Sequence, residues 1–228
     1  SALVCAVMLG KRDGFPHEPM MPHNVVLCLV GTGMLWVGWF GFNAGSALAA
    51  DGIAASAFVA THVATATGAL AWLAVEWSYR GKPTVLGAAS GAVAGLVAIT
   101  PAAGFVGPVS AILIGLGGGV ICYLGVFLKN KMGYDDALDV LGIHGIGGTW
   151  GALATGLFAS VGGGTGLFFG NPGQLVIQAV GVVVTWVFAF AGTYLILKVV
   201  DAIVGLRVSK EEEILGLDLS QHSERAYG

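Results

Sequence analysis

Charged residues are scarce in this sequence. Asp, Glu, Lys and Arg make up only 10% of its 228 residues, whereas 56% are hydrophobic. Soluble domains carry about a quarter charged residues, so this chain cannot build a surface that water solvates. Its 38 glycines suit a packed membrane bundle, because small residues let helix backbones approach closely. The composition therefore predicts an all-α polytopic membrane protein.

Sulfur clusters and excess positive charge are also missing. Cys5, Cys28 and Cys122 lie in apolar runs, without a CxxC pair or a His/Cys cluster. We expect them to be small buried side chains rather than a disulfide or a metal site, and we expect no cofactor. The formal net charge of −3 gives no reason to expect a nucleic-acid partner.

Six apolar segments qualify as membrane spans, because a spanning helix needs about 20 mostly apolar residues. They cover residues 24–46, 52–78, 84–100, 107–129, 136–158 and 173–204. The third is short and continues through Pro101 into a glycine-rich turn, whereas the sixth is long enough to tilt or to extend beyond the bilayer. Residues 206–228 are polar and charged, which indicates a solvated tail.

Basic residues occur only at alternate ends of these spans. They are Lys11, Arg12, Arg80, Lys82, Lys129, Lys131, Lys198, Arg207, Lys210 and Arg225. The intervening loops, residues 47–51, 101–107 and 159–172, contain neither Lys nor Arg. Cytoplasmic loops carry the excess of basic residues in membrane proteins, so the basic loops and the tail are expected on the cytoplasmic side.

Residues 1–10 form an apolar run that ends at Lys11 and Arg12. At 1.5 Å per residue, this run would cross about half of a bilayer. We expect it to be the end of a longer helix, and the chain to lack a preceding part of the protein. A short re-entrant or interfacial helix is the alternative, although its first N–H groups would be unsatisfied within the bilayer.

His144 is the main polar candidate inside a predicted span, where ionisable residues are costly and mark functional sites by default. It lies about 12 Å along its predicted helix from Asp136, within the glycine-rich stretch 142–148. Asp139 lies on the same span, whereas His62 on the second span is interpreted as structural. Four other acidic residues are expected to be solvated near the cytoplasmic interface: Glu76, Asp135, Asp136 and Asp201.

An aromatic stripe runs along the first full span. Its members, at i, i+4, i+7 and i+11, share one helix face and are Leu35, Trp39, Phe42 and Ser46. Such a stripe often faces lipid or packs in a core, and that interpretation stays open. Because this stripe ends in a hydroxyl near the external surface, it could instead surround a small cation with aromatic faces and an acceptor.

Several long motifs resemble the Amt/methylammonium permease family of ammonium transporters. Residues 21–24, 30–33 and 36–46 resemble the sixth helix of that family, 87–91 and 98–106 its eighth helix and following loop, and 135–145 its tenth helix. The resemblance covers the whole chain and implies helices 6 to 11 after a stub of helix 5. It thus implies the second inverted repeat of the eleven-helix ammonium transporter fold, with the first repeat missing from this chain.

The resemblance implies the transport of ammonium or ammonia, with methylammonium as an analogue, by a protein that is not an enzyme. His144 matches the second histidine of the family's pore-lining pair. Phe42 matches one of two stacked phenylalanines that close the outer gate. Ser46 matches the hydroxyl of an external site that recruits the cation.

Five further residues match pore positions of the family. Trp39 and Leu35 match residues that line the lumen beneath the gate. Asp139 matches an acidic residue of the tenth helix that supports the site. Thr100 and Ser90 match minor polar positions along the conduction path.

The other histidine, the other gate phenylalanine, the recruitment-site tryptophan and the helix-5 aspartate belong to the family's first half. None of them lies within this chain, so a conduction path is expected to need the missing N-terminal half of the same protein. The resemblance also implies a homotrimer in the inner (plasma) membrane. A PII-type signal protein is expected to dock at the tail, where Ile214, Leu215, Leu217 and Leu219 offer apolar anchors.

Two related functions stay open, a Rh-type ammonia gas channel and a membrane ammonium sensor. The tryptophan-rich segment 36–46 resembles the Amt branch rather than the Rh branch. A sensor is expected to need an appended signalling domain, for which residues 206–228 are too short. A membrane-embedded enzyme that used His144 and Asp139 would need a nucleophile or a metal cluster, and none is spaced for it.

Overall fold

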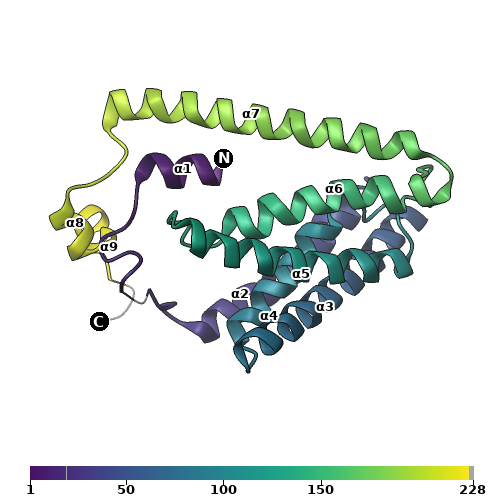
Figure 1. Cartoon of the computed structure of the whole chain (residues 1–228), viewed down its shortest axis with the longest axis horizontal. Helices are drawn as coiled ribbons and strands as arrows, with labels where there is room; N and C mark the ends of the chain where they lie inside the picture. Colours follow the sequence, from purple (N-terminus) through teal and green to yellow (C-terminus); the bar gives the residue numbers. More distant parts are fainter. Residues whose placement is uncertain (19, 226–228) are drawn as a thin grey trace.

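The computed structural model describes residues 1–18 and 20–225, and within these ranges it contains helices and no strands (Figure 1). The elements are α1 (Ala2–Leu9), α2 (Val25–Gly45), α3 (Gly52–Arg80), α4 (Val85–Ile99), α5 (Pro108–Met132), the π-helix η1 (Leu141–Gly145), α6 (Ile146–Phe158), the 3₁₀ turn η2 (Leu167–Phe169), α7 (Pro172–Val204), α8 (Lys210–Leu215) and α9 (Leu217–His222). By length and composition, α2, α3, α5 and α7 can each cross a membrane. The shorter α4 is apolar over its 15 residues.

Several helices begin at residues suited to that position. The Asn24 side chain accepts a hydrogen bond from Leu27 N at 2.9 Å, and Asp51 accepts from the first amides of α3. Thr84 caps α4 in the same way, while α5 and α7 begin with Pro108 and Pro172. The capping side chains accept hydrogen bonds from N–H groups that a helix start leaves unpaired, and proline has no N–H group to leave unpaired.

The helix that carries His144 starts later than the segment 136–158. Residues 137–138 form a turn, and Asp139 adopts a left-handed backbone conformation with φ 56°. Helical conformation begins at Val140, passes through η1 and continues in α6. His144 therefore lies about one turn into this helix rather than the two turns from Asp136 that a continuous helix would give.

Helices α3, α4 and α5 pack side by side (Figure 1) and form the best-buried part of the chain. Glycine makes this contact possible. A Cβ atom on Gly95 of α4 would lie 2.3 Å from the Ala64 carbonyl oxygen of α3, and one on Gly115 of α5 would meet the same oxygen at 2.3 Å. On α5, a Cβ on Gly119 would lie 2.4 Å from the Gly68 oxygen. The three backbones are thus too close for any larger residue at these positions.

Helix α7, 33 residues long, runs along one side of the molecule with α1 beside it (Figure 1). It contacts α6 and α1, and Thr193 Oγ1 donates to Ser1 Oγ at 2.9 Å. None of its residues is buried. Exposed apolar side chains therefore occur along the helix from Val176 to Val204 in this chain.

Three of the four acidic residues expected to be solvated are instead buried, and only Asp201 is exposed. Glu76 is 3% exposed and accepts hydrogen bonds from the Thr84 amide and hydroxyl, each at 3.0 Å. Gly87 lies so close that a Cβ there would be 2.0 Å from Glu76 Oε2. The expectation was wrong because these carboxylates are buried and accept hydrogen bonds from groups at helix starts and in loops. Asp135 and Asp136 are described below.

The expectation of buried cysteines holds for Cys122 only. Cys28 is exposed and Cys5 is half-buried, and all three thiols are free.

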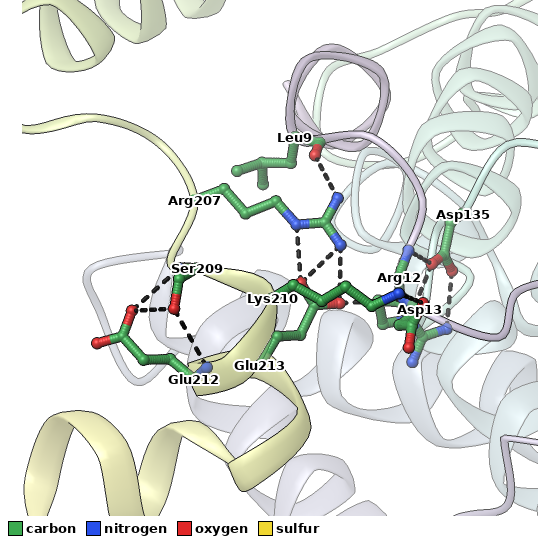
Figure 2. A network of polar contacts seen from close by, with 9 residues as sticks. All are labelled: Leu9, Arg12, Asp13, Asp135, Arg207, Ser209, Lys210, Glu212 and Glu213. Atoms are coloured by element: carbon green, nitrogen blue, oxygen red, sulfur yellow. Dashed lines mark hydrogen bonds and ion pairs between the residues drawn. The ribbon is translucent and has the colours of Figure 1, made fainter.

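The tail folds into α8 and α9 and is held to the N-terminal end of the chain by Arg207 (Figure 2). The Arg207 guanidinium binds the Glu213 carboxylate at 2.6 Å and donates to the Leu9 carbonyl oxygen, at the end of α1, at 3.0 Å. Glu213 also accepts from the Asp13 amide at 3.1 Å, and Lys210 pairs with the Asp13 carboxylate. The tail is thus docked on the α1–α2 connection, and its residues 226–228 lie outside the described residues.

Arg12 continues this network to the segment before η1 (Figure 2). Its Nε and Nη2 donate to the Asp135 carboxylate at 2.8 and 2.7 Å, and its backbone amide donates at 2.9 Å. These bonds outweigh burial and hold the pKa of Asp135 below its ordinary value. The α1–α2 connection therefore links the tail to the start of the His144 helix.

Gly95→Ala should destabilise the protein, because the new methyl group would overlap the Ala64 carbonyl oxygen. Overpacking of this kind costs about 1–3 kcal/mol, which should lower the melting temperature in detergent. Gly192→Ala on α7 is the control, since no atom lies within 4 Å of its Cβ position and Ala favours a helix over Gly. Equal melting temperatures for the two variants would contradict the close packing.

Glu213→Gln should release the tail, because it removes the charge that Arg207 binds. We expect faster tryptic cleavage after Lys210 at neutral pH than in wild type. Glu211→Gln, which changes an exposed residue of the same helix, should leave the cleavage rate unchanged. Similar rates in both variants would show that Glu213 does not hold the tail.

The same contact should depend on pH. The Arg207 hydrogen bonds and the Asp13 amide keep the pKa of Glu213 below its ordinary value. This carboxylate therefore stabilises the docked tail fully at pH values above the ordinary pKa of a glutamate, and the contribution is lost as the pH falls through the lower pKa of the docked state.

Candidate functional site

The π-helix η1 presents His144 on the side away from α5. Its glycine neighbours face α5 closely: a Cβ on Gly142 would lie 2.8 Å from Val126 Cγ2, and one on Gly147 would lie 2.9 Å from Cys122 Sγ. Ile143 is buried between them and accepts a hydrogen bond from the Cys122 thiol at 3.6 Å. With one face of the helix pressed against α5, the His144 side chain is left exposed.

His144 lines a cavity of about 630 Å³ between the η1–α6 helix and α7, bounded at one end by residues 1–3. Most of its wall is apolar, and the polar groups are few. Besides His144 these are Ser1, Thr149, Gln178, Thr185 and the Trp186 indole, whose Nε1 donates to Thr149 Oγ1 at 2.9 Å. An apolar cavity with a few converging polar groups is the usual form of a small-molecule site.

Of the predicted stripe of α2, Trp39 contacts the end of α4, whereas Leu35, Phe42 and Ser46 are exposed. Trp39 Nε1 donates to Thr100 Oγ1 at 2.8 Å, and the Trp39 and Phe42 rings meet edge to face with centroids 5.6 Å apart. Ser46 Oγ donates to the Phe42 carbonyl oxygen at 2.6 Å, which leaves its lone pairs free to accept. These contacts link Thr100, Trp39, Phe42 and Ser46 in turn, and we refer to these four residues as the outer group. Leu35, one turn before Trp39 on α2, is exposed.

A single apolar cluster joins this group to the His144 helix. Trp39 packs against buried residues of α3, α4 and α5, and Ile143 belongs to the same cluster. Within residues 1–18 and 20–225, however, no hydrogen bond or ring contact connects His144 itself to the stripe. The two predicted parts of the site therefore lie on one scaffold without touching.

The remaining predicted residues lie at the edges of the site. Ser90 is half-buried on α4, about 15 Å along the helix from Thr100. Asp139 is not on a helix: it lies in the left-handed turn before Val140, where its carboxylate pairs with the Lys129 ammonium. It therefore lies near the expected cytoplasmic end, immediately before Val140, at which the helix begins.

Three residues of this region are not recognisable from the sequence as part of a site: Lys129, which the sequence presents as a basic loop residue, Thr149 and Trp186. The i+10 separation of Lys129 from Asp139 and the 37 residues between Thr149 and Trp186 give no periodic pattern. In the described part of the chain no group of His, Cys, Asp and Glu residues could hold a metal ion.

Comparison with known proteins places the chain clearly. The model of the Ammonium Transporter Family matches residues 1–227. The chain is 53% identical to an ammonium transporter of Bacillus subtilis and 51% identical to the ammonium transporter Amt1 of Archaeoglobus fulgidus, and these matches include the whole chain but 57% and 58% of the relatives.

Solved structures agree. The fold matches a crystal structure of Saccharomyces cerevisiae Mep2 with a TM-score of 0.84 and 37% identity, over 92% of this chain and 51% of that one. It also matches a protein described as a sensor Amt protein, with a TM-score of 0.86 and 32% identity, over 96% of this chain and 56% of that one. The chain therefore spans about half the length of its relatives. It is an all-α multi-pass membrane chain, and it belongs to the Ammonium Transporter Family, whose members are transporters and not enzymes.

Proposed function

We propose that the protein containing this chain passes ammonium nitrogen across the membrane through a narrow apolar pore, and that His144 lines that pore. The observation that carries the proposal is the exposure of His144 on a glycine-rich π-turn, over an apolar cavity. An ionisable side chain on an exposed apolar membrane surface is costly unless it serves a path for a polar solute.

The outer part of the path would select the cation. Ammonium and potassium ions are close in size, so selection needs directional acceptors and aromatic faces rather than a sieve. The free lone pairs of Ser46 and the rings of Phe42 and Trp39 supply both. In this proposal Phe42 closes the gate, and Trp39 and Leu35 line the lumen beneath it.

The inner part would exclude intact cations. An apolar lumen makes the passage of a charge expensive, whereas ammonium can release a proton and continue as ammonia, which potassium cannot imitate. A neutral imidazole can both accept from and donate to ammonia, which is the role proposed for His144. Thr100 and Ser90 would act as minor polar positions along this path, and Asp139 would support the site.

The path would be completed by another part of the same protein. The chain spans about half the length of its relatives, and the surfaces of α7 and of His144 are open. We infer that an N-terminal half, related to this half as an inverted repeat, covers these surfaces and supplies the first histidine of the pair, to which His144 is the second. This chain alone would then not transport.

The orientation in the membrane and the partner of the tail are proposed from the basic loops and from the exposed apolar side chains of the tail. The basic loops support a tail on the cytoplasmic side, and a location in the inner (plasma) membrane is proposed from the family resemblance. The exposed side chains of Ile214, Leu215 and Leu217 support the docking of a PII-type signal protein on the tail. A homotrimer is proposed from the family resemblance alone.

A sensor function is the second candidate, because a sensor Amt protein shares the fold. A sensor would bind ammonium without passing it at a comparable rate. A Rh-type gas channel would pass ammonia but not respond to changes at Ser46 and Phe42, since it needs no cation site. Uptake measurements therefore separate the three functions.

His144→Ala in the full-length protein should change the rate or the ion selectivity of methylammonium uptake into liposomes. Loss of the imidazole removes the group that favours ammonia over an intact cation, so we expect a fall of about tenfold or more in the ratio of methylammonium to potassium uptake. His62→Ala is the control, because the His62 ring lies against the Trp36 and Phe40 rings, neither of which belongs to the proposed path. Normal, selective uptake by His144→Ala, or transport by this chain alone, would place the pore elsewhere.

Ser46→Ala should weaken recruitment of the cation. We expect the KM for methylammonium to rise by about threefold to tenfold with little change in maximal rate, because one hydrogen bond to a charged group is lost at an exposed site. Ser78→Ala is matched, since Ser78 is also exposed and bonds the carbonyl oxygen four residues earlier, at 2.8 Å. An unchanged KM in Ser46→Ala would remove Ser46 from the site.

A further inference from the structure

The C-terminal part of α5 packs along the π-turn that carries His144. Cys122, Gly125, Val126 and Lys129 lie on one face of α5 at helical spacing. The first three contact the turn directly: Cys122 binds the Ile143 carbonyl oxygen, a Cβ on Gly125 would lie 3.4 Å from Gly142 Cα, and Val126 lies against Gly142. Lys129, one turn further along, continues this face to the residues that precede the turn.

Lys129 binds both acidic residues at the start of the His144 helix. Its ammonium pairs with the Asp139 carboxylate and donates to the Asp136 carbonyl oxygen at 3.1 Å. Asp136, itself 6% exposed, accepts from the Leu141 amide at 2.8 Å, at the first residue of η1. The Lys129 side chain is only 11% exposed, so it does not simply extend its charge into water as a cation at a membrane interface usually does.

The backbone next to these contacts has two unusual features. Asp139 has φ 56°, a region that residues with a Cβ seldom occupy, and η1 is a π-helix, which is rare and often occurs at functional sites. A π-turn holds one more residue than the α-helical turn that would replace it. If it relaxed, residues on one side would rotate by about 100° relative to the other, and His144 would leave the face it now occupies.

We infer that Lys129 is a positioning residue for the pore: by fixing Asp136 and Asp139 it maintains the π-turn that directs His144 into the conduction path. This inference rests on the proposed function of His144. Lys129 does not line the His144 cavity, so its effect on transport must pass through the turn.

The test uses the full-length protein in liposomes and compares Lys129→Met, His144→Ala and the double variant. We expect Lys129→Met to lower the ratio of methylammonium to potassium uptake by about tenfold, since small displacements of a working group can cost as much as a hundredfold. In the His144→Ala background, Lys129→Met should change the ratio no further, because both changes remove the same contribution. Lys129→Arg, which keeps the charge and the donors, should retain most of the selectivity.

Lys131→Met is the matched control, because Lys131 is an exposed cation two residues away that lies over the Phe127 ring at 4.7 Å. It should leave the uptake ratio unchanged. If Lys129→Met fails to fold, Lys129→Gln, which keeps a donor but removes the charge, replaces it in every comparison.

The outcomes separate this inference from the proposed function. Selective uptake by a folded Lys129→Met or Lys129→Gln protein, or effects that add to those of His144→Ala, would overturn the positioning role while leaving the pore in place. A purely structural role would lower the amount of folded protein and the total uptake without changing the ratio. If His144→Ala itself had no effect on selectivity, the pore assignment would fail first.

Discussion

Backbone contact between α3, α4 and α5 is the constraint on which the rest of the structure depends. Gly95 and Gly115 bring two helices against the same Ala64 carbonyl oxygen, and no side chain larger than hydrogen fits there. In a bilayer, where apolar side chains gain little by leaving lipid, such close packing is a main source of helix association. The packed helices then form a fixed surface, against which α2 places Trp39 and the η1–α6 helix places Ile143.

Three buried carboxylates complete this scaffold at the expected cytoplasmic edge. Glu76 caps the start of α4, Asp136 binds the first amide of η1, and Asp135 is held by Arg12. Each carboxylate replaces water with protein donors, as burial requires. Because Arg12 belongs to the connection on which the tail docks, the tail and the start of the His144 helix share one polar network.

Much of the fold could be predicted from the sequence, because long apolar runs, glycine content and basic loops each reflect the bilayer directly. The motif around residues 36–46 and the glycine-flanked His144 also pointed to the family, which the comparisons confirm. Local geometry could not be predicted. The left-handed Asp139, the π-turn and the burial of Glu76 depend on partners such as Lys129 and Thr84, whose pairing follows from tertiary packing rather than from any periodic pattern. For the same reason the expected solvation of Asp135 and Asp136 was wrong.

The central claim is that the packed helices leave His144 facing a conduction path between this half of the protein and its N-terminal half. A cryo-electron microscopy map of the full-length protein in lipid nanodiscs tests it most directly. The account predicts the His144 imidazole on the lumen between the two halves, with residues 141–145 still in a π-turn and Lys129 on Asp139. A His144 side chain that faces lipid or a neighbouring protomer, on a regular α-helix, would contradict it.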